Sequence, residues 1–185
     1  MNKTIISSVI VAAMLSTSNV LAGQAGSMYG GIQYAIATYS EDGMSEEIEP
    51  TALVGRLGKN INDNFSIEGR LGIGLQDDTV NIGGIADVKL EIDSVIGVYG
   101  VGHVNLNESS SIYGLLGLSR VEGTISLPDF PSAGSESDDE TGLSFGVGAD
   151  IGIGNNVALN IEYVQYLNKS DFDVSALAFG VKFGF

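Results

Sequence analysis

The stretch Phe65-Ser66-Ile67-Glu68-Gly69-Arg70-Leu71-Gly72-Ile73-Gly74-Leu75 decides the fold, because large apolar residues alternate along it with small or charged ones. Successive side chains of an extended strand point to opposite faces, so this spacing gathers the large apolar residues on one face. The opposite face holds Ser66, Glu68, Arg70 and two glycines. The stretch therefore predicts a β-strand with one apolar face and one face of small and charged residues.

The same period of two residues recurs along the chain, and no helical period of 3.6 is sustained. Regular alternation predicts strands at Leu143–Ile151, Val157–Tyr163 and Leu177–Phe185. Less regular alternation predicts further strands at Met28–Tyr39, Pro50–Lys59, Leu90–Val104 and Ser111–Val121, and the faces of the last two are left unassigned. Together these segments predict an all-β protein with eight strands.

The segments between the strands are alternately short and long. Asn60–Asn64, Asn105–Ser110 and Gly152–Asn156 are short, whereas Ser40–Glu49, Gln76–Val88, Glu122–Thr141 and Asn168–Asp173 are long and polar. Outer-membrane barrels have short turns at the periplasmic end and longer loops outside. The connectors thus favour an antiparallel up-and-down transmembrane barrel with both chain ends on the periplasmic side.

A soluble barrel of the lipocalin kind would also alternate, but in the opposite sense. Its large apolar face would point inward, and its other face would have to meet water. Here the second face is mainly Gly, Ala and Ser with a few charges, which suits a crowded lumen better than a solvated exterior. The large apolar face suits lipid, where the backbone must be closed into a barrel.

The first 22 residues have the pattern of a secretory signal peptide. Lys3 precedes an apolar stretch, Ile5–Leu15, and Val20 and Ala22 place small residues at the cleavage site. A transmembrane anchor is the alternative, but the apolar run is shorter than the roughly 20 residues needed to span a bilayer. We expect cleavage after Ala22, with residues 23–185 forming one outer-membrane barrel domain.

The charge of the chain is unevenly distributed. Eight Lys and Arg face 23 Asp and Glu, giving a net charge of −15, yet 44% of residues are hydrophobic. The four long connectors carry −5, −3, −6 and −1, so they hold nearly all of the acidic excess. This balance argues against nucleic-acid binding, and the absence of Cys excludes disulfides and thiolate chemistry.

Several motifs resemble small eight-stranded outer-membrane barrels of the outer membrane protein X/Ail type and the porin-like β-barrel domain. The resemblance is clearest at 95–121 (VIGVYGVGHVNLNESSSIYGLLGLSRV), and it extends to 62–70, Glu162-Tyr163 and Lys182–Phe185. It implies a monomer in outer-membrane lipid and lipopolysaccharide. It also implies that the barrel-assembly machinery reads a C-terminal signal, whose residues here would be Phe179, Val181, Phe183 and Phe185.

The predicted lumen contains five charged residues, Arg56, Glu68, Arg70, Glu162 and Lys182, and Arg120 is a further candidate. A turn symmetric about Asn62 would place Arg56 opposite Glu68, and Lys182 can approach Glu162 from the neighbouring strand. Because lone buried charges are costly and an eight-stranded barrel is filled by its own side chains, we expect these residues to form an ion-paired plug. The alternative is an ion-pair gate in a narrow channel.

The sequence predicts no catalytic, cofactor or metal site. A lipid A hydrolase would need a His beside a Ser, but the only His, His103, lacks the expected Ser two places later. The acidic run Ser135–Glu140 lacks the spacing of a Ca²⁺ loop and is interpreted as a solvated loop. We expect a non-enzymatic envelope-structural or adhesin-like role carried by acidic external loops. The alternatives are a narrow ion channel and a lipid A-modifying enzyme.

Overall fold

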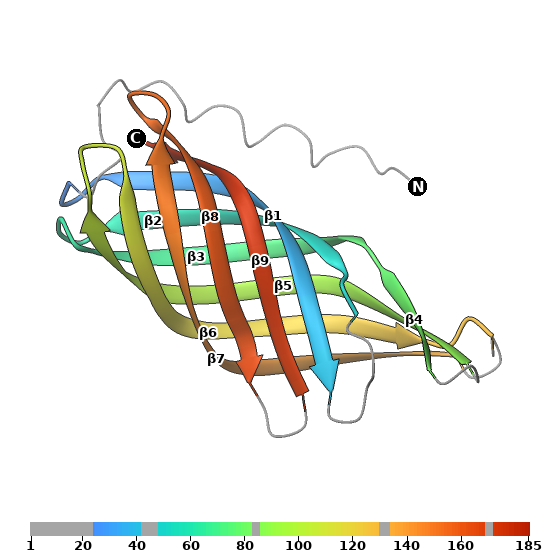
Figure 1. The fold of residues 1–185 in the computed structure, drawn as a ribbon. Coiled ribbons are helices and arrows are strands. Elements are labelled where there is room, and N and C mark those ends of the chain that lie inside the picture. The colour runs from blue at the N-terminus through green and yellow to red at the C-terminus, as the bar shows by residue number, and fades with distance from the viewer. Residues whose placement is uncertain (1–23, 42–47, 83–85, 130–133, 169–171) are drawn as a thin grey trace, which may run out of the picture.

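The computed structural model describes residues 24–41, 48–82, 86–129, 134–168 and 172–185, and so does not include the expected signal peptide and its cleavage site. The described residues form nine β-strands (Figure 1). None of the described residues belongs to a helix that is long and apolar enough to cross a membrane. In chain order the strands are β1 (Met28–Glu41), β2 (Thr51–Asn60), β3 (Phe65–Gln76), β4 (Asp78–Ile82), β5 (Ala86–Asn105), β6 (Ser111–Ser126), β7 (Ser135–Gly152), β8 (Val157–Asn168) and β9 (Phe172–Gly184).

The strands close into an eight-stranded antiparallel barrel, as the sequence predicted. The sheet runs β3-β2-β1-β9-β8-β7-β6-β5-β4, and a further pairing of β3 with β5 closes it. β3 pairs with the C-terminal part of β5, and β4 pairs with its N-terminal part. The two strands therefore occupy one position in the barrel. Closure leaves the barrel itself without a free edge, which is the condition for a sheet in lipid.

The predicted facing of the regular strands is confirmed. The apolar residues of β3 point outward, with Leu71 67% exposed, whereas Ser66, Glu68 and Arg70 are buried in the lumen. The structure also assigns the two strands that the sequence left open. In β5 and β6, Tyr99, His103, Tyr113, Leu115 and Ser119 point inward, and the outward residues are mainly Ile, Leu and Val.

The register of β2 against β3 differs from the expectation. Arg56 lies opposite Arg70, and Gly58 lies opposite Glu68, so the pairing is shifted by two residues. The cause lies in the turn, where the Asn62 side-chain oxygen accepts hydrogen bonds from the backbone of Asn64 and Phe65, and the turn is centred one residue later than assumed. A shift of two residues preserves the inward and outward faces.

Two of the long connectors are largely strand. β5, β6 and β7 continue past the barrel, so that Lys89 pairs with Ser126, which pairs in turn with Ser135. Together with β4 they form a four-stranded extension, which we call the external sheet and which projects at the right of Figure 1. At about 3.3 Å per residue the 20 residues of β5 would span some 65 Å, far more than the roughly 25 Å apolar band of a barrel. The expected loops at 76–88 and 122–141 are therefore corrected to hairpins.

Lumenal tyrosines lie over glycines of neighbouring strands. A Cβ atom on Gly58 would fall 2.1 Å from the Tyr29 ring, and one on Gly148 would fall 2.5 Å from the Tyr113 ring. Gly117 lies opposite Tyr99 in the same manner. Glycine is required at these positions because the aromatic rings occupy the space of the missing side chains.

Candidate functional site: the lumen and the external sheet

A bidentate ion pair forms the centre of the lumen. Arg70 donates from Nη1 and Nη2 to the two carboxylate oxygens of Glu162, at 2.5 and 2.7 Å. Its Nε donates to Glu68 Oε1 at 2.6 Å. All three side chains are at most 2% exposed to solvent. One guanidinium thus neutralises carboxylates from two different strands, β3 and β8, across the barrel interior.

A second ion pair lies closer to the short turns. Lys182 Nζ is 2.7 Å from Asp150 Oδ2 and lies over the Tyr29 ring at 4.3 Å from its centroid. Arg56 is 3.4 Å from Asp150, 3.8 Å from Glu162 and 4.0 Å from Glu68. Arg56 therefore connects the two ion pairs, and every carboxylate in the group has a cation within 4.0 Å.

Neutral polar side chains complete this network. Tyr113 donates its hydroxyl hydrogen to Glu162 at 2.7 Å, and Asn160 donates to Asp150 at 2.7 Å. Gln33 donates to the Asn160 side-chain oxygen at 2.7 Å. Buried charges whose remaining lone pairs are satisfied in this way make a rigid arrangement. Together with the ion pairs described above, these side chains form a group of nine that we call the lumen network: Gln33, Arg56, Glu68, Arg70, Tyr113, Asp150, Asn160, Glu162 and Lys182.

The five charged residues singled out from the sequence all lie in this network, but the expected pair of Lys182 with Glu162 and the expected register of Arg56 are wrong. Lys182 pairs with Asp150, because it lies opposite Ala158 in the register and Glu162 lies opposite Ala178. Arg56 does not lie directly opposite Glu68. Arg120 is not lumenal: it is exposed on the external sheet and pairs with Asp139 at 2.8 Å.

Sequence reasoning missed the other four members of the network. Asp150 lies on the same small-residue face as Ser144, Gly146 and Gly148, and that placement was the available signal that it is lumenal. Gln33 and Asn160 alternate with apolar neighbours in the same way. Tyr113 carried no such signal, because an aromatic residue fits the lipid face as well as the lumen.

His103 does lie beside a serine. Ser66 Oγ is hydrogen-bonded to His103 Nε2 at 2.8 Å and to the Tyr29 hydroxyl at 3.1 Å. Both residues are buried in the lumen, and in the part of the chain that the structure describes no carboxylate hydrogen-bonds to the imidazole. Buried side chains of this kind hold each other in place but present no nucleophile to a substrate.

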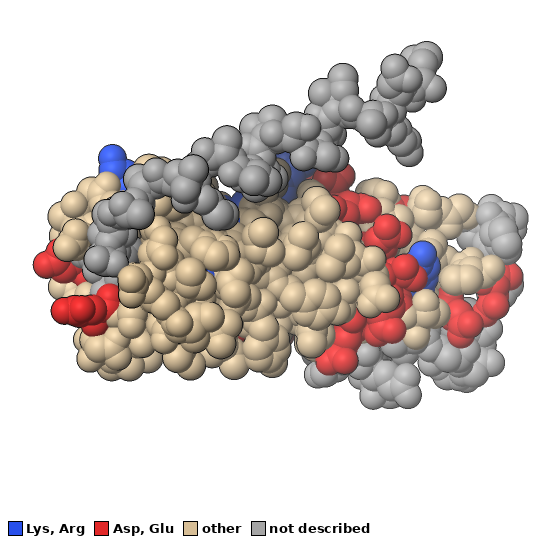
Figure 2. Space-filling view, turned by 90° about the horizontal axis from the view of Figure 1, so that it is seen from above, with Lys and Arg blue, Asp and Glu red and all other residues tan. Residues whose placement is uncertain are grey.

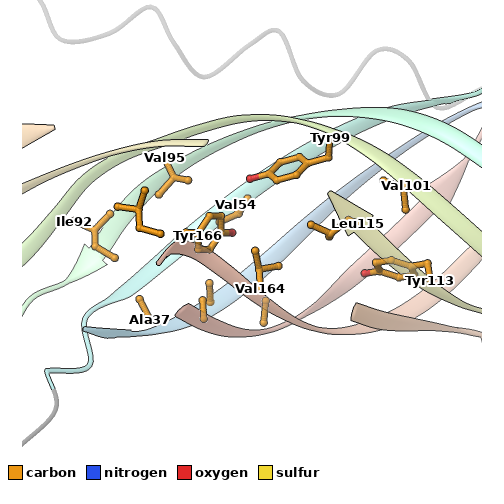
Figure 3. Close-up of a cluster of buried hydrophobic side chains, with 14 residues drawn as sticks. Ala37, Val54, Ile92, Val95, Tyr99, Val101, Tyr113, Leu115, Val164 and Tyr166 are labelled. Atoms are coloured by element: carbon orange, nitrogen blue, oxygen red, sulfur yellow. The ribbon is translucent and has the colours of Figure 1, made fainter. Parts of the chain in front are cut away.

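Apolar side chains fill the lumen toward the external sheet. Figure 3 shows Val54, Val95, Tyr166, Ala37 and Ile92 converging there. Leu167, only 1% exposed, belongs to the same cluster. The lumen is thus polar near the short turns and apolar near the long connectors, and the sequence-based expectation of a lumen of small and charged residues missed this apolar part.

The external sheet carries a strong excess of acid. Figure 2 shows most of the visible acidic residues at one end of the molecule and a few at the other, while the barrel wall between them is almost free of charge. Lys89 lies 3.2 Å from Asp77, and its hydrogen bond lowers the pKa of that exposed carboxyl below the ordinary value. Arg120 is paired with Asp139. Among the described residues, no group of three acidic or His side chains is placed to hold a metal ion.

Among the described residues, no strand pairs with one edge of the projecting part of β7. Residues 135–144 pair with β6 on one side, but pairing with β8 extends only from Gly152 to Phe145. Within the described ranges, the other edge of that segment has no ladder. An unpaired strand presents backbone donors and acceptors to another extended chain.

The residues of the expected C-terminal signal lie on β9 and just after it. Phe179 is exposed on the outer wall, whereas Val181, Phe183 and Phe185 are half-buried. The backbone of Phe185 exchanges hydrogen bonds of 2.9 and 3.0 Å with Met28. These bonds join the end of the last strand to the start of the first.

Comparison with known proteins gives a consistent fold. A family model described as outer membrane protein beta-barrel domain matches residues 7–185. The structure resembles Ail, the attachment invasion locus protein of Yersinia pestis, with a TM-score of 0.65, 21% identity and coverage of 88% of this chain and 100% of that one. It also resembles Neisserial surface protein A (TM-score 0.59, 18% identity, 85% and 97% covered) and OprG of Pseudomonas aeruginosa (0.58, 15%, 90% and 99%). No curated protein matches the sequence.

Proposed function

Because the chain belongs to the outer membrane protein β-barrel domain family, which places it in the outer membrane, we propose that it is a monomeric surface protein whose external sheet binds a cationic partner. In this proposal the barrel is an anchor with a sealed lumen. The signal peptide exports the chain, and no catalytic step is involved. An envelope-structural role alone would need the same anchor but not the open strand edge.

The open edge of β7 is the observation that carries this proposal. Strand addition binds an extended peptide through its backbone, and neighbouring side chains give specificity. Along this edge Glu136, Asp138 and Asp139 are acidic, and the external cations Lys89 and Arg120 are already paired. The related Ail structure has been solved with a heparin analogue, sucrose octasulfate. The acidic sheet of this chain supports a partner of the opposite charge.

A peptide-binding experiment tests the proposal. We expect a fluorescent peptide of alternating Lys and Val to bind the protein in zwitterionic nanodiscs, as measured by anisotropy. A peptide of alternating Lys and Pro has the same charge but cannot form a ladder, so we expect it to bind roughly tenfold more weakly, since strand pairing adds several hydrogen bonds. Equal binding of the two peptides would contradict strand addition.

Matched lysine substitutions localise the interaction. Ser137→Lys with Asp139→Lys places positive charge on the open edge, and lysine on an edge strand discourages pairing. We expect this variant to lose most of the Lys-Val binding. Glu108→Lys with Asn155→Lys makes the same change of charge at exposed residues of two short turns on the opposite end of the barrel and should bind nearly as the original protein does. Similar losses in both variants would show a non-specific charge effect.

The second candidate, a narrow channel, makes an opposite prediction about conductance. Every charged side chain of the lumen network has an ion-pair partner, and the apolar cluster lies between the network and the external sheet. We expect no steady ion-selective openings in planar bilayers, because an ion would have to break buried pairs and then cross apolar side chains. Reproducible single-channel openings whose conductance changes in the Arg70→Ala variant would contradict the sealed anchor and favour the channel.

Assembly and lipid contacts complete the proposal. We propose that the barrel-assembly machinery reads Phe179, Val181, Phe183 and Phe185, supported by their alternation along β9 and the terminal aromatic residue. The outward apolar residues would contact outer-membrane lipid and the acyl chains of lipopolysaccharide.

A further inference from the structure

A cavity of about 730 Å³ opens where the external sheet joins the barrel. Its floor is the top of the apolar cluster, formed by Ala37, Ile92 and Leu167. Val121, Ile125 and Leu127 line the side toward the external sheet. The volume lies within the usual range for sites that hold small organic molecules. The lumen network lies below this floor, so the cavity is separate from it.

The rim of the cavity is acidic. Glu136, Asp138 and Glu140 of β7 line it, and alternation along the strand puts all three on the same face. Glu136 lies opposite Ile125, and Asp138 lies opposite Gly123, so both carboxylates are directly beside the apolar wall. Gly123 has no side chain, which leaves room between Asp138 and Ile92, its neighbour on β5.

We propose that this cavity binds a small cationic amphiphile, with its apolar part on the Ile92 floor and its ammonium group at Glu136 and Asp138. An apolar pocket with a few convergent charged groups selects ligands by burying the apolar part and orienting the charged end. An anionic amphiphile would place its charge against the acidic rim. A neutral one would gain burial but no ion pair. The inference is distinct from strand addition at the β7 edge, which uses the backbone of that strand, although Glu136 and Asp138 contribute negative charge to both.

Methyl NMR of the full barrel in zwitterionic nanodiscs tests the inference with octylammonium as the probe. We expect saturable shifts in the methyl signals of Ile92, Val121 and Ile125. The outward methyls of Ile96 and Leu118 should follow only the partition of the probe into lipid, because these side chains face the bilayer. Octanoate and octanol have the same chain length and should bind at least several-fold more weakly than octylammonium.

Two double variants with the same change of charge separate the rim from the general acidity of the external sheet. Glu136→Gln with Asp138→Asn should weaken octylammonium binding roughly three- to tenfold, as expected for the loss of two partly exposed ion pairs. Glu122→Gln with Asp139→Asn neutralises two acidic residues that lie opposite each other on β6 and β7. Both lie outside the cavity lining, so this variant should leave the affinity within about twofold.

Three results would overturn the inference. One is the absence of saturable shifts at Ile92 and Val121. Another is equal affinity for octylammonium, octanol and octanoate, which would show an apolar site without charge selection. The third is equal weakening by both double variants. None of these results bears on the binding of the Lys-Val peptide to the β7 edge, so failure here is distinguishable from failure of the proposed function.

Discussion

Replacing Arg70 by Ala is expected to lower the free energy of unfolding by about 3–5 kcal/mol, the range observed when one partner of a buried ion pair is removed. Arg70 holds both Glu68 and Glu162 at hydrogen-bonding distance, and all three residues are at most 2% exposed. Its loss would leave two carboxylates facing only Arg56, whose distances to them are 4.0 and 3.8 Å. Urea unfolding of the barrel in lipid vesicles measures the change.

Arg120→Ala is the matched control, because it removes an Arg whose ion pair with Asp139 is exposed. Exposed pairs contribute about 0–1 kcal/mol, so this variant should unfold close to the original midpoint. Adding Glu162→Gln to Arg70→Ala removes one of the stranded charges and should recover part of the loss. Equal midpoints for Arg70→Ala and Arg120→Ala would mean that the lumen network contributes little to stability.

Replacing Gly58 by Ala is expected to destabilise the barrel by about 1–3 kcal/mol, the usual cost of overpacking an interior. The new Cβ would lie 2.1 Å from the Tyr29 ring. That ring cannot move freely, because its hydroxyl is bonded to Ser66 and Lys182 lies over its face. The shift of the unfolding midpoint in the same vesicles measures the cost.

Gly69→Ala is the control for backbone effects. Gly69 lies on β3, and a Cβ there would meet no atom within 4 Å. It should leave stability unchanged or raise it by about 0.4–1 kcal/mol through the unfolded chain. When Tyr29 is replaced by Ala, the Gly58→Ala change should cost less stability than it does in the original protein. Additive effects would contradict direct contact between the two side chains.

Much of the barrel could be predicted from residue alternation alone. The period of two fixes which face each residue of β3, β7, β8 and β9 occupies, and a membrane barrel has only two environments to assign. The same rule placed Arg70 and Glu162 in the lumen without any knowledge of their contacts. Strand number and closure followed from the alternating connectors.

The partners within the lumen could not be predicted, because they depend on register. The turn capped by Asn62 is centred one residue later than assumed, and this moved the partner of Arg56 by two positions along β3. The external sheet was missed for a different reason: its strands lie beyond the lipid and carry polar residues at positions that would be apolar in the barrel. Alternation of Val88, Leu90 and Ile92 was a signal that β5 begins earlier than Leu90.

The separation of the lumen network from the external sheet has a consequence for how such a protein can diversify. No residue of the network lies in the projecting parts of β4–β7, and β3 and β8 end before that region. Substitutions in these projecting parts therefore change the surface that a partner, an antibody or a phage would meet. They leave the contacts that stabilise the barrel unchanged. Selection can act on recognition and on folding through different residues of the same strands.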